Sequence, residues 1–158
     1  MNLPEKTLND LFACWPVARF ATLSGNAQPH IVPIVFCEYG GALFSPIDGK
    51  RKKGTPLQRT HNIATNPTSS LLLDHFESDW QRLWWVRIDC IADLWEPPEE
   101  DAQRIAERLI NKYPQYLDPT LMFDRSAYLR LQPRKVTAWA QSGKQSSIQD
   151  TIASTAPR

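Results

Sequence analysis

The sequence lacks the features that mark several large classes of protein. Its apolar runs, such as that around Leu71-Leu72-Leu73, are far shorter than the roughly 18 residues of a membrane-spanning helix, so we expect no membrane protein. The 18 basic and 17 acidic residues leave a net charge of +1, too little for a general attraction to nucleic acid. Residues 1–5 carry neither the basic nor the apolar region of a signal peptide, which predicts a cytoplasmic protein.

Cysteine and the common catalytic motifs are also scarce. The three cysteines, Cys14, Cys37 and Cys90, have no metal-binding spacing, which predicts reduced, buried thiols. The sequence contains no GxGxxG, GxxxxGKS/T, HExxH or CxxC motif. These absences leave little support for a hydrolase or a metalloenzyme. An enzyme with this sequence would depend on a bound cofactor for its chemistry.

Proline and tryptophan, by contrast, are abundant. Thirteen prolines against six glycines favour a β-rich domain with rigid loops over a helix bundle. Three of the six tryptophans lie between Trp80 and Trp85. Such a concentration of aromatic side chains indicates either an unusual core or a surface that binds something flat.

The pattern of apolar and turn-forming residues predicts a mainly β protein, an antiparallel β-barrel decorated by three helices. The predicted helices cover residues 4–14, 55–65 and 99–112. The predicted strands cover residues 17–23, 30–37, 42–46, 69–75, 82–95, 128–131 and 135–140. These elements form a single domain of residues 1–140. Residues 141–158 are polar and lack periodicity, so we expect a mobile tail there.

Two segments could carry chemistry. The basic residues 50–53 precede a predicted helix start at Thr55, and free helix N–H groups with nearby cations suit a phosphate; the alternative is a solvated charge cluster. In residues 73–89, alternation places Trp85, Arg87 and Asp89 on one strand face. This arginine and this carboxylate are costly to bury unless each pairs with the other or with a ligand. One interpretation of the segment is therefore a ligand site. The alternative is a packed aromatic hairpin in which the two residues form an ion pair.

The three histidines have no metal-binding spacing, so we expect no metal site. Neither a serine nor a cysteine nucleophile stands beside an obvious base, and no catalytic residue is assigned. His30 and His75 remain the candidates for a general acid.

Several short motifs follow one another in a characteristic order: Ala21-Thr22-Leu23, Pro29–Val35, Asp48-Gly49-Lys50 and Asn62–Pro67. Their order resembles the pyridoxamine 5'-phosphate oxidase-like split-barrel superfamily, which binds FMN. The string Asp74-His75, Asp79-Trp80 and Leu83–Arg87 is similar to a subgroup of deazaflavin (coenzyme F420)-dependent oxidoreductases. The resemblance covers about residues 15–140, nearly the whole domain.

The resemblance implies a six-stranded antiparallel split β-barrel that forms a homodimer with two cofactor sites at its interface. Contacts to the cofactor ring would come from His30, Ile31, Val32 and Pro33. Contacts to its phosphate would come from Phe44, Ser45, Lys50, Arg51 and Lys53. The partner subunit would contribute Trp84, Trp85, Arg87 and Trp139.

The chain also departs from that family. His30 stands where pyridoxamine phosphate oxidases carry an arginine, and their C-terminal arginine- and histidine-bearing substrate motif is absent. Both departures speak against pyridoxamine phosphate as the substrate. We therefore predict an oxidoreductase that transfers a hydride between bound F420, or alternatively FMN, and a small organic substrate.

Two other classes of function remain as alternatives. One is a non-catalytic flavin- or haem-binding split-barrel protein, in which His75 would serve as the iron ligand. The other is nucleic-acid binding through residues 50–53, which would require a wider basic face than this charge balance suggests.

Overall fold

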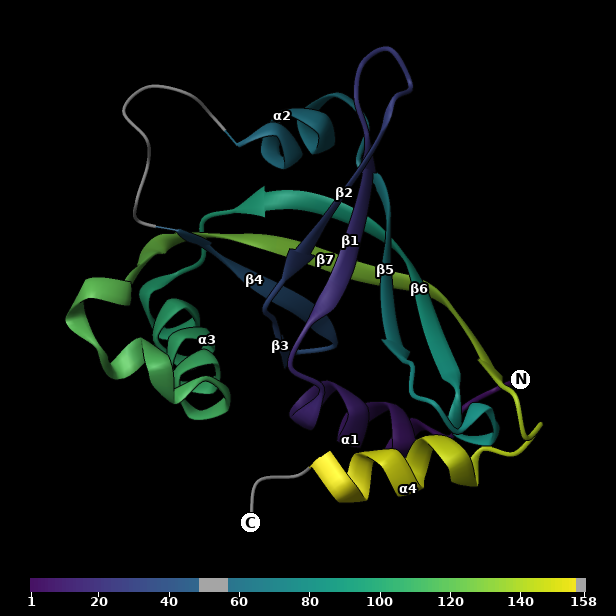
Figure 1. The fold of residues 1–158 in the computed structure, drawn as a ribbon. Helices are drawn as coiled ribbons and strands as arrows, with labels where there is room; N and C mark the ends of the chain where they lie inside the picture. Colours follow the sequence, from purple (N-terminus) through teal and green to yellow (C-terminus); the bar gives the residue numbers. More distant parts are fainter. Residues whose placement is uncertain (49–56, 156–158) are drawn as a thin grey trace.

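The computed structural model describes residues 1–48 and 57–155, and one strongly curved antiparallel sheet dominates it (Figure 1). Within those residues the sheet has seven strands in the order β2-β1-β5-β6-β7-β4-β3. The strands are β1 (Ala18–Leu23), β2 (Pro29–Ile34), β3 (Cys37–Tyr39), β4 (Ala42–Asp48), β5 (Thr68–His75), β6 (Trp84–Trp95) and β7 (Phe123–Ala140). The predicted class, a mainly β antiparallel split barrel, is confirmed.

The strand count of six is corrected to seven. The run predicted as one strand over residues 30–37 divides into β2 and β3, which lie at opposite edges of the sheet. Conversely, the two strands predicted over residues 128–131 and 135–140 form the single strand β7. Its register against β6 shifts beside Pro133, where the missing N–H interrupts the ladder without ending the strand.

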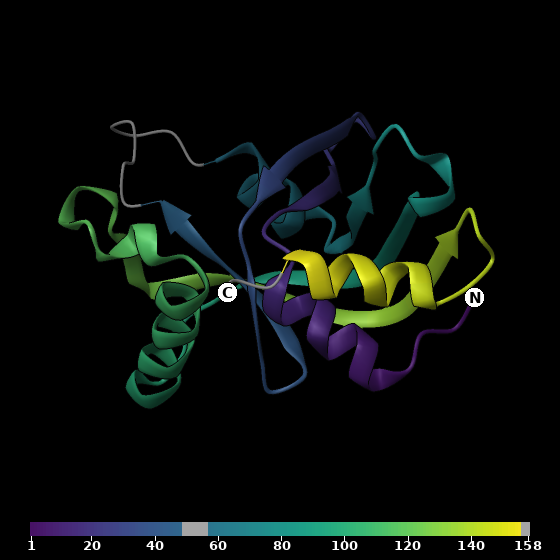
Figure 2. The same cartoon turned by 60° about the horizontal axis from the view of Figure 1, so that its bottom comes forward.

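Helices cover the two ends of the sheet. They are α1 (Glu5–Cys14), α2 (Gln58–Thr65), α3 (Glu99–Lys112) and α4 (Ser146–Thr155), with short 3-10 turns η1 (Trp80–Arg82), η2 (Pro114–Leu117) and η3 (Pro119–Leu121). Helices α1 and α4 lie side by side at one end, and α2 lies at the other (Figures 1 and 2). The predicted helix start at Thr55 falls outside the described residues.

Helix α4 corrects the prediction of a mobile tail from residue 141. Ile148 is fully buried in the main core, and Ile152, one turn later, packs against that core. Between them, Thr151 accepts a hydrogen bond of 3.1 Å from the indole Nε1 of Trp84. Two isoleucines and one well-placed hydroxyl therefore hold a segment whose composition is otherwise polar.

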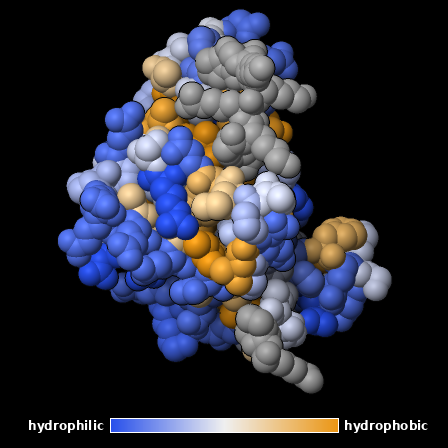
Figure 3. Space-filling model, turned by 90° about the vertical axis from the view of Figure 1, so that its left-hand side faces the viewer, coloured by the Kyte–Doolittle hydropathy of each residue, from blue (hydrophilic) through white to orange (hydrophobic). Residues whose placement is uncertain are grey.

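The core has two parts. The larger fills the barrel between β1, β5, β6 and the helices α1 and α4, around Phe20, Leu71 and Ile88. The smaller lies under α3, where Ile105 and Leu109 pack on aromatic side chains of β4 and β7. The side of the molecule that carries α3 is mostly hydrophilic, with an apolar strip through it (Figure 3).

Three further expectations concern the cysteines, metal binding and membrane-spanning helices. Cys37 and Cys90 are buried free thiols and Cys14 is half-buried, so the predicted reduced state is consistent with the structure. In the part of the chain that the structure describes, no group of three or more His, Cys, Asp or Glu residues could hold a metal ion. No helix among the described residues is long and apolar enough to cross a membrane.

Candidate functional site

An aromatic pocket of about 430 Å³ opens on the outer face of β5, β6 and β7. We call it the aromatic pocket; it is lined by Leu72, Asp74, His75, Phe76, Leu83, Trp84, Trp85, Arg87 and Trp139. Strand alternation creates it, because the residues that face away from the core occupy every second position. The register aligns Asp74, Trp85 and Trp139 in one row across the three strands.

A pair of tryptophans forms the flat wall of the pocket. The rings of Trp85 and Trp139 stack with centroids 6.5 Å apart and planes only 17° from parallel. Trp139 remains 40% exposed, and Phe76 at the rim is exposed as well. Large apolar rings left open to solvent on a rigid strand pair are typical of a surface that binds another molecule.

Charged side chains at the pocket are paired. The Nε of Arg87 lies 3.1 Å from the Oδ1 of Asp89 on the same strand, so these two residues are partners of each other, as one of the two alternatives requires. Arg19 of β1 approaches Asp74 at 3.5 Å. Both pairs are partly exposed, so they contribute little to stability and remain available to orient a polar ligand group.

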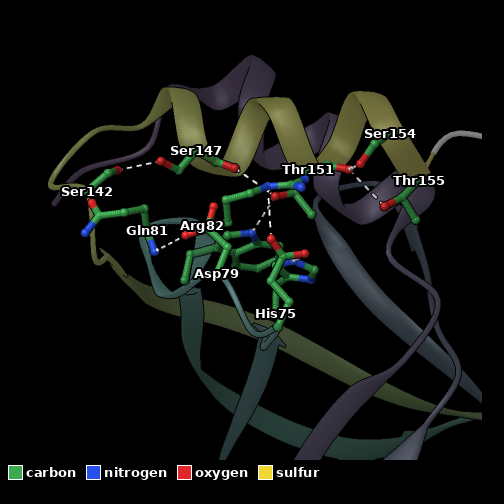
Figure 4. A network of polar contacts seen from close by, with 11 residues as sticks. His75, Asp79, Gln81, Arg82, Ser142, Ser147, Thr151, Ser154 and Thr155 are labelled. Carbon is green, nitrogen blue, oxygen red and sulfur yellow. Dashed lines mark hydrogen bonds and ion pairs between the residues drawn. The ribbon is translucent and has the colours of Figure 1, made fainter.

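His75 closes the inner end of the pocket. Its ring stacks on Trp84 with centroids 6.0 Å apart. Its Nε2 lies 3.2 Å from Glu77, whose other oxygen lies 3.2 Å from Arg82. Figure 4 shows this network between η1 and α4, where Thr151 meets the indole of Trp84. The wall of the pocket is therefore held by elements far apart in the sequence.

Trp84 itself is a core residue. Only 1% of its side chain is exposed, and it lines the pocket as the buried support of His75. Its outward neighbours Trp85, Arg87 and Trp139 lie together in the pocket, which groups three of the four predicted partner-subunit contacts on one surface.

The predicted ring-binding residues lie elsewhere, on the edge strand β2. His30 and Val32 face inward, whereas Ile31 and Pro33 face outward, and Ile31 is 65% exposed. The Nδ1 of His30 is buried and has no hydrogen-bond partner among the described residues. A buried imidazole nitrogen without a partner is uncommon and marks a place where a ligand atom would be stabilised.

The predicted phosphate-binding residues form a third group. Phe44 is buried against Tyr39 and Trp95, and Ser45 is buried beside it on β4. Phe44 pairs with Arg130 of β7, nine residues before Trp139, a separation of about 30 Å along an extended strand. Lys50, Arg51 and Lys53 lie outside the described residues, so their predicted role stays a prediction.

Five residues of the aromatic pocket are absent from the predicted cofactor contacts, namely Leu72, Asp74, His75, Phe76 and Leu83, although His75 is a candidate for a general acid. Leu72 and Asp74 lie next to Arg87 and Trp85 because β5 pairs with β6, and the apolar run of β5 gives no sign of this in the sequence. Phe76 and Leu83 lie in the connection between β5 and β6, where no periodicity marks them.

The curved antiparallel sheet with a pocket on its outer face places this chain among the mainly β, split-barrel proteins. The family model for pyridoxamine 5'-phosphate oxidase matches residues 4–140. The chain therefore belongs to this family, as its sequence motifs predicted. A comparison with curated proteins finds no match.

Solved structures share the fold at low sequence identity. A conserved hypothetical protein from Mycobacterium tuberculosis has a TM-score of 0.69 at 18% identity, over 89% of this chain and 86% of that chain. HutZ, a haem storage protein from Vibrio cholerae, has a TM-score of 0.64 at 16% identity, over 89% and 95%. An F420 reductase has a TM-score of 0.60 at 17% identity, over 85% and 98%.

Proposed function

We propose that this protein is a cytoplasmic oxidoreductase that binds a deazaflavin or flavin at the aromatic pocket and transfers a hydride to or from a small organic substrate. The observation that carries the proposal is the stacked, solvent-open pair Trp85 and Trp139 beside a cavity of about 430 Å³. Cavities of this size, mostly apolar with a few polar groups, are typical of sites for small molecules and cofactors.

The residues present fit a planar ring. Trp85 and Trp139 offer a flat apolar surface, Leu72 and Leu83 extend it, and Arg87 adds a cation at one edge. The bound cofactor would supply the hydride chemistry. The chain would position the ring, exclude water with its tryptophans and hold a proton at the Nε2 of His75, which Glu77 already orients.

A second copy of the chain would complete the site. Within one chain the aromatic pocket, the β2 group and the β4 group lie apart, and the outward side chains of β2 include the exposed Ile31. An exposed apolar edge on the same sheet face as the pocket favours a homodimer in which β2 of one protomer meets the tryptophans of the other.

F420 is the favoured cofactor and FMN the alternative. The string from Asp74 to Arg87 carries the resemblance to F420-dependent oxidoreductases, and this same string builds β5, η1 and β6 around the pocket. The structural similarity to an F420 reductase supports the same choice at the level of the fold.

The test is a titration of the purified apoprotein with F420 and with FMN, followed by tryptophan fluorescence. We expect quenching by one cofactor, and we expect Trp139→Leu to weaken its binding at least about tenfold, since a base or ring stacked on an aromatic side chain gains ~1–3 kcal/mol. Trp80→Leu is the matched control, because Trp80 is also a solvent-exposed tryptophan but lies outside the pocket. Equal losses in both variants, or no binding of either cofactor, would contradict the proposal.

A non-catalytic haem-binding protein is the second candidate, because His75 places an imidazole on the wall of the aromatic pocket. Titration with haem and with the variant His75→Ala separates the two functions. A Soret shift that depends on His75, without quenching by F420 or FMN, would support haem binding in place of the oxidoreductase.

A further inference from the structure

A second cleft, of about 290 Å³, lies between α1, β3 and α3 and shares no residue with the aromatic pocket. We call it the lysine cleft; it is lined by Asn9, Phe12, Ala13, Cys37, Glu38, Arg108, Asn111 and Lys112. Polar and charged side chains dominate its α3 wall. Neither the fold nor the proposed cofactor site explains why they gather there.

Lys112 is the unusual member of this cleft. Its Nζ donates a hydrogen bond of 2.7 Å to the carbonyl oxygen of Phe12 and lies 3.7 Å from the centroid of the Phe36 ring. Among the described residues no carboxylate forms an ion pair with it, although a mostly buried ammonium ordinarily requires one.

Burial lowers the pKa of Lys112 from 10.5 to about 7, and Cys37 and Cys14 would oppose this only as thiolates. Burial in turn raises the pKa of both thiols, so they are uncharged at neutral pH. The other charged groups facing the amine are Arg108 on α3 and Glu38 on β3. A neutral fraction of Lys112 therefore exists near pH 7, and its free lone pair makes this amine a nucleophile.

Arg108 lies one helical turn before Lys112, so the two cations project from the same face of α3. Its guanidinium approaches Glu38 at 3.9 Å, which is longer than a hydrogen bond. It also lies over the ring of Tyr39, 5.6 Å from the centroid. A guanidinium held in this way keeps the capacity to bind a ligand carboxylate through two parallel hydrogen bonds.

We propose that the lysine cleft is a second ligand site, in which Lys112 condenses reversibly with a small aldehyde whose neighbouring carboxylate binds Arg108. The Nζ lone pair forms a bond to the carbonyl carbon, and a proton passes from nitrogen to oxygen to give a carbinolamine. The second N–H proton and the hydroxyl then leave as one water molecule, and the C=N bond forms. The step requires no oxidant or reductant.

The shared helix face limits the size of the ligand. Side chains one turn apart on a helix have Cβ atoms about 5–6 Å from each other, so one small molecule that carries both an aldehyde and a carboxylate can reach Lys112 and Arg108 together. The amides of Asn9 and Asn111 on the cleft wall can accept or donate hydrogen bonds to such a compound.

The test uses glyoxylate as the probe, with cyanoborohydride to reduce any imine to a stable carboxymethyl-lysine that peptide mass mapping can locate. At pH 7 we expect Lys112 to be labelled at least about tenfold faster than the surface residues Lys6 and Lys144, because burial lowers the pKa of the Lys112 amine. Labelling of Lys112 at or below the rate of these two lysines would overturn the proposal.

A variant at Arg108 tests the carboxylate. Arg108→Gln should slow the labelling of Lys112 by glyoxylate at least about fivefold, the loss of a charge-assisted hydrogen bond, and should leave labelling by acetaldehyde unchanged. An equal effect on both aldehydes, or on neither, would overturn the assigned ligand class. The readout needs neither F420 nor a flavin, so it is independent of the proposed oxidoreductase function.

Discussion

At the scale of single residues, the interior of this protein satisfies its polar groups with few exceptions. The amide of the fully buried Asn62 donates to Thr22, and the hydroxyl of Tyr113 donates to the carbonyl oxygen of Phe36. Trp84 and Thr151 are a third such pair. Buried polar atoms without partners are costly, and within residues 1–48 and 57–155 the Nδ1 of His30 is a buried side-chain atom that has none.

The hydrogen bond between Trp84 and Thr151 gives a first prediction. Thr151→Val keeps the shape of the side chain but leaves the buried indole N–H unsatisfied, so the free energy of unfolding should fall by about 1–3 kcal/mol. Thr155→Val, one turn later at the exposed last residue of α4, should change it by less than about 0.5 kcal/mol. Urea denaturation of the three proteins measures both values, and equal stabilities would show that the pair contributes nothing.

Lys112 gives a second prediction, on the pH dependence of stability. Its pKa is about 7 in the folded chain and near 10.5 when unfolded, so between these values the unfolded state binds more protons. The penalty for burying the charged amine is complete below pH 7 and disappears as the pH rises. Relative to Lys112→Met, the wild-type protein should therefore gain up to about 2 kcal/mol between pH 7 and pH 9. A stability difference that stays constant over this range would contradict a neutral lysine.

At the scale of elements, residue periodicity predicts the two faces of a strand where the sequence alternates. It fails where the position of a segment depends on a residue far away in the chain. The alternation in β6 predicts correctly that Trp85 and Arg87 share one face, and the structure turns this face outward while it buries Val86 and Ile88. The apolar run of β5 shows no alternation, so the outward positions of Leu72 and Asp74 follow only from its pairing with β6. Helix α4 depends on Trp84, 67 residues earlier in the chain, and no local pattern records that contact.

Helix α4 gives a third prediction. Ile148 is fully buried, so Ile148→Ala should destabilise the fold by about 2–4 kcal/mol through the lost burial and the cavity it leaves. Asp150→Ala, on the exposed side of the same helix, should have little effect. Thermal and urea unfolding of both variants provide the measurement. If the segment were a mobile tail, the two substitutions would be indistinguishable.

At the scale of the whole molecule, one chain holds all the described parts of the predicted site but does not assemble them. The row Pro33, Arg19, Leu72, Arg87 and Thr137 crosses five strands on a face whose side chains are half-buried or exposed. The family resemblance of the sequence motifs predicts which residues belong to the site, and that assignment stays a prediction. The motifs could not place those residues relative to one another, because strand alternation gives only the face, and the proposed site spans two copies.

The homodimer gives the last prediction. Light scattering of the wild-type protein should give about twice the chain mass of 18.1 kDa. Ile31→Glu places a charge on the exposed apolar edge of β2, where it should be tolerated by the folded monomer but not by an apolar interface. We therefore expect monomers and at least about tenfold weaker binding of F420 or FMN.

Leu117→Glu is the matched control, since Leu117 is a comparably exposed apolar residue on η2, outside the outer sheet face. If the glutamate at position 31 left both the mass and the affinity unchanged, β2 would not belong to the interface. If it produced monomers that bound the cofactor as tightly as the wild type, the site would be complete within one chain, and the aromatic pocket alone would have to hold the ring.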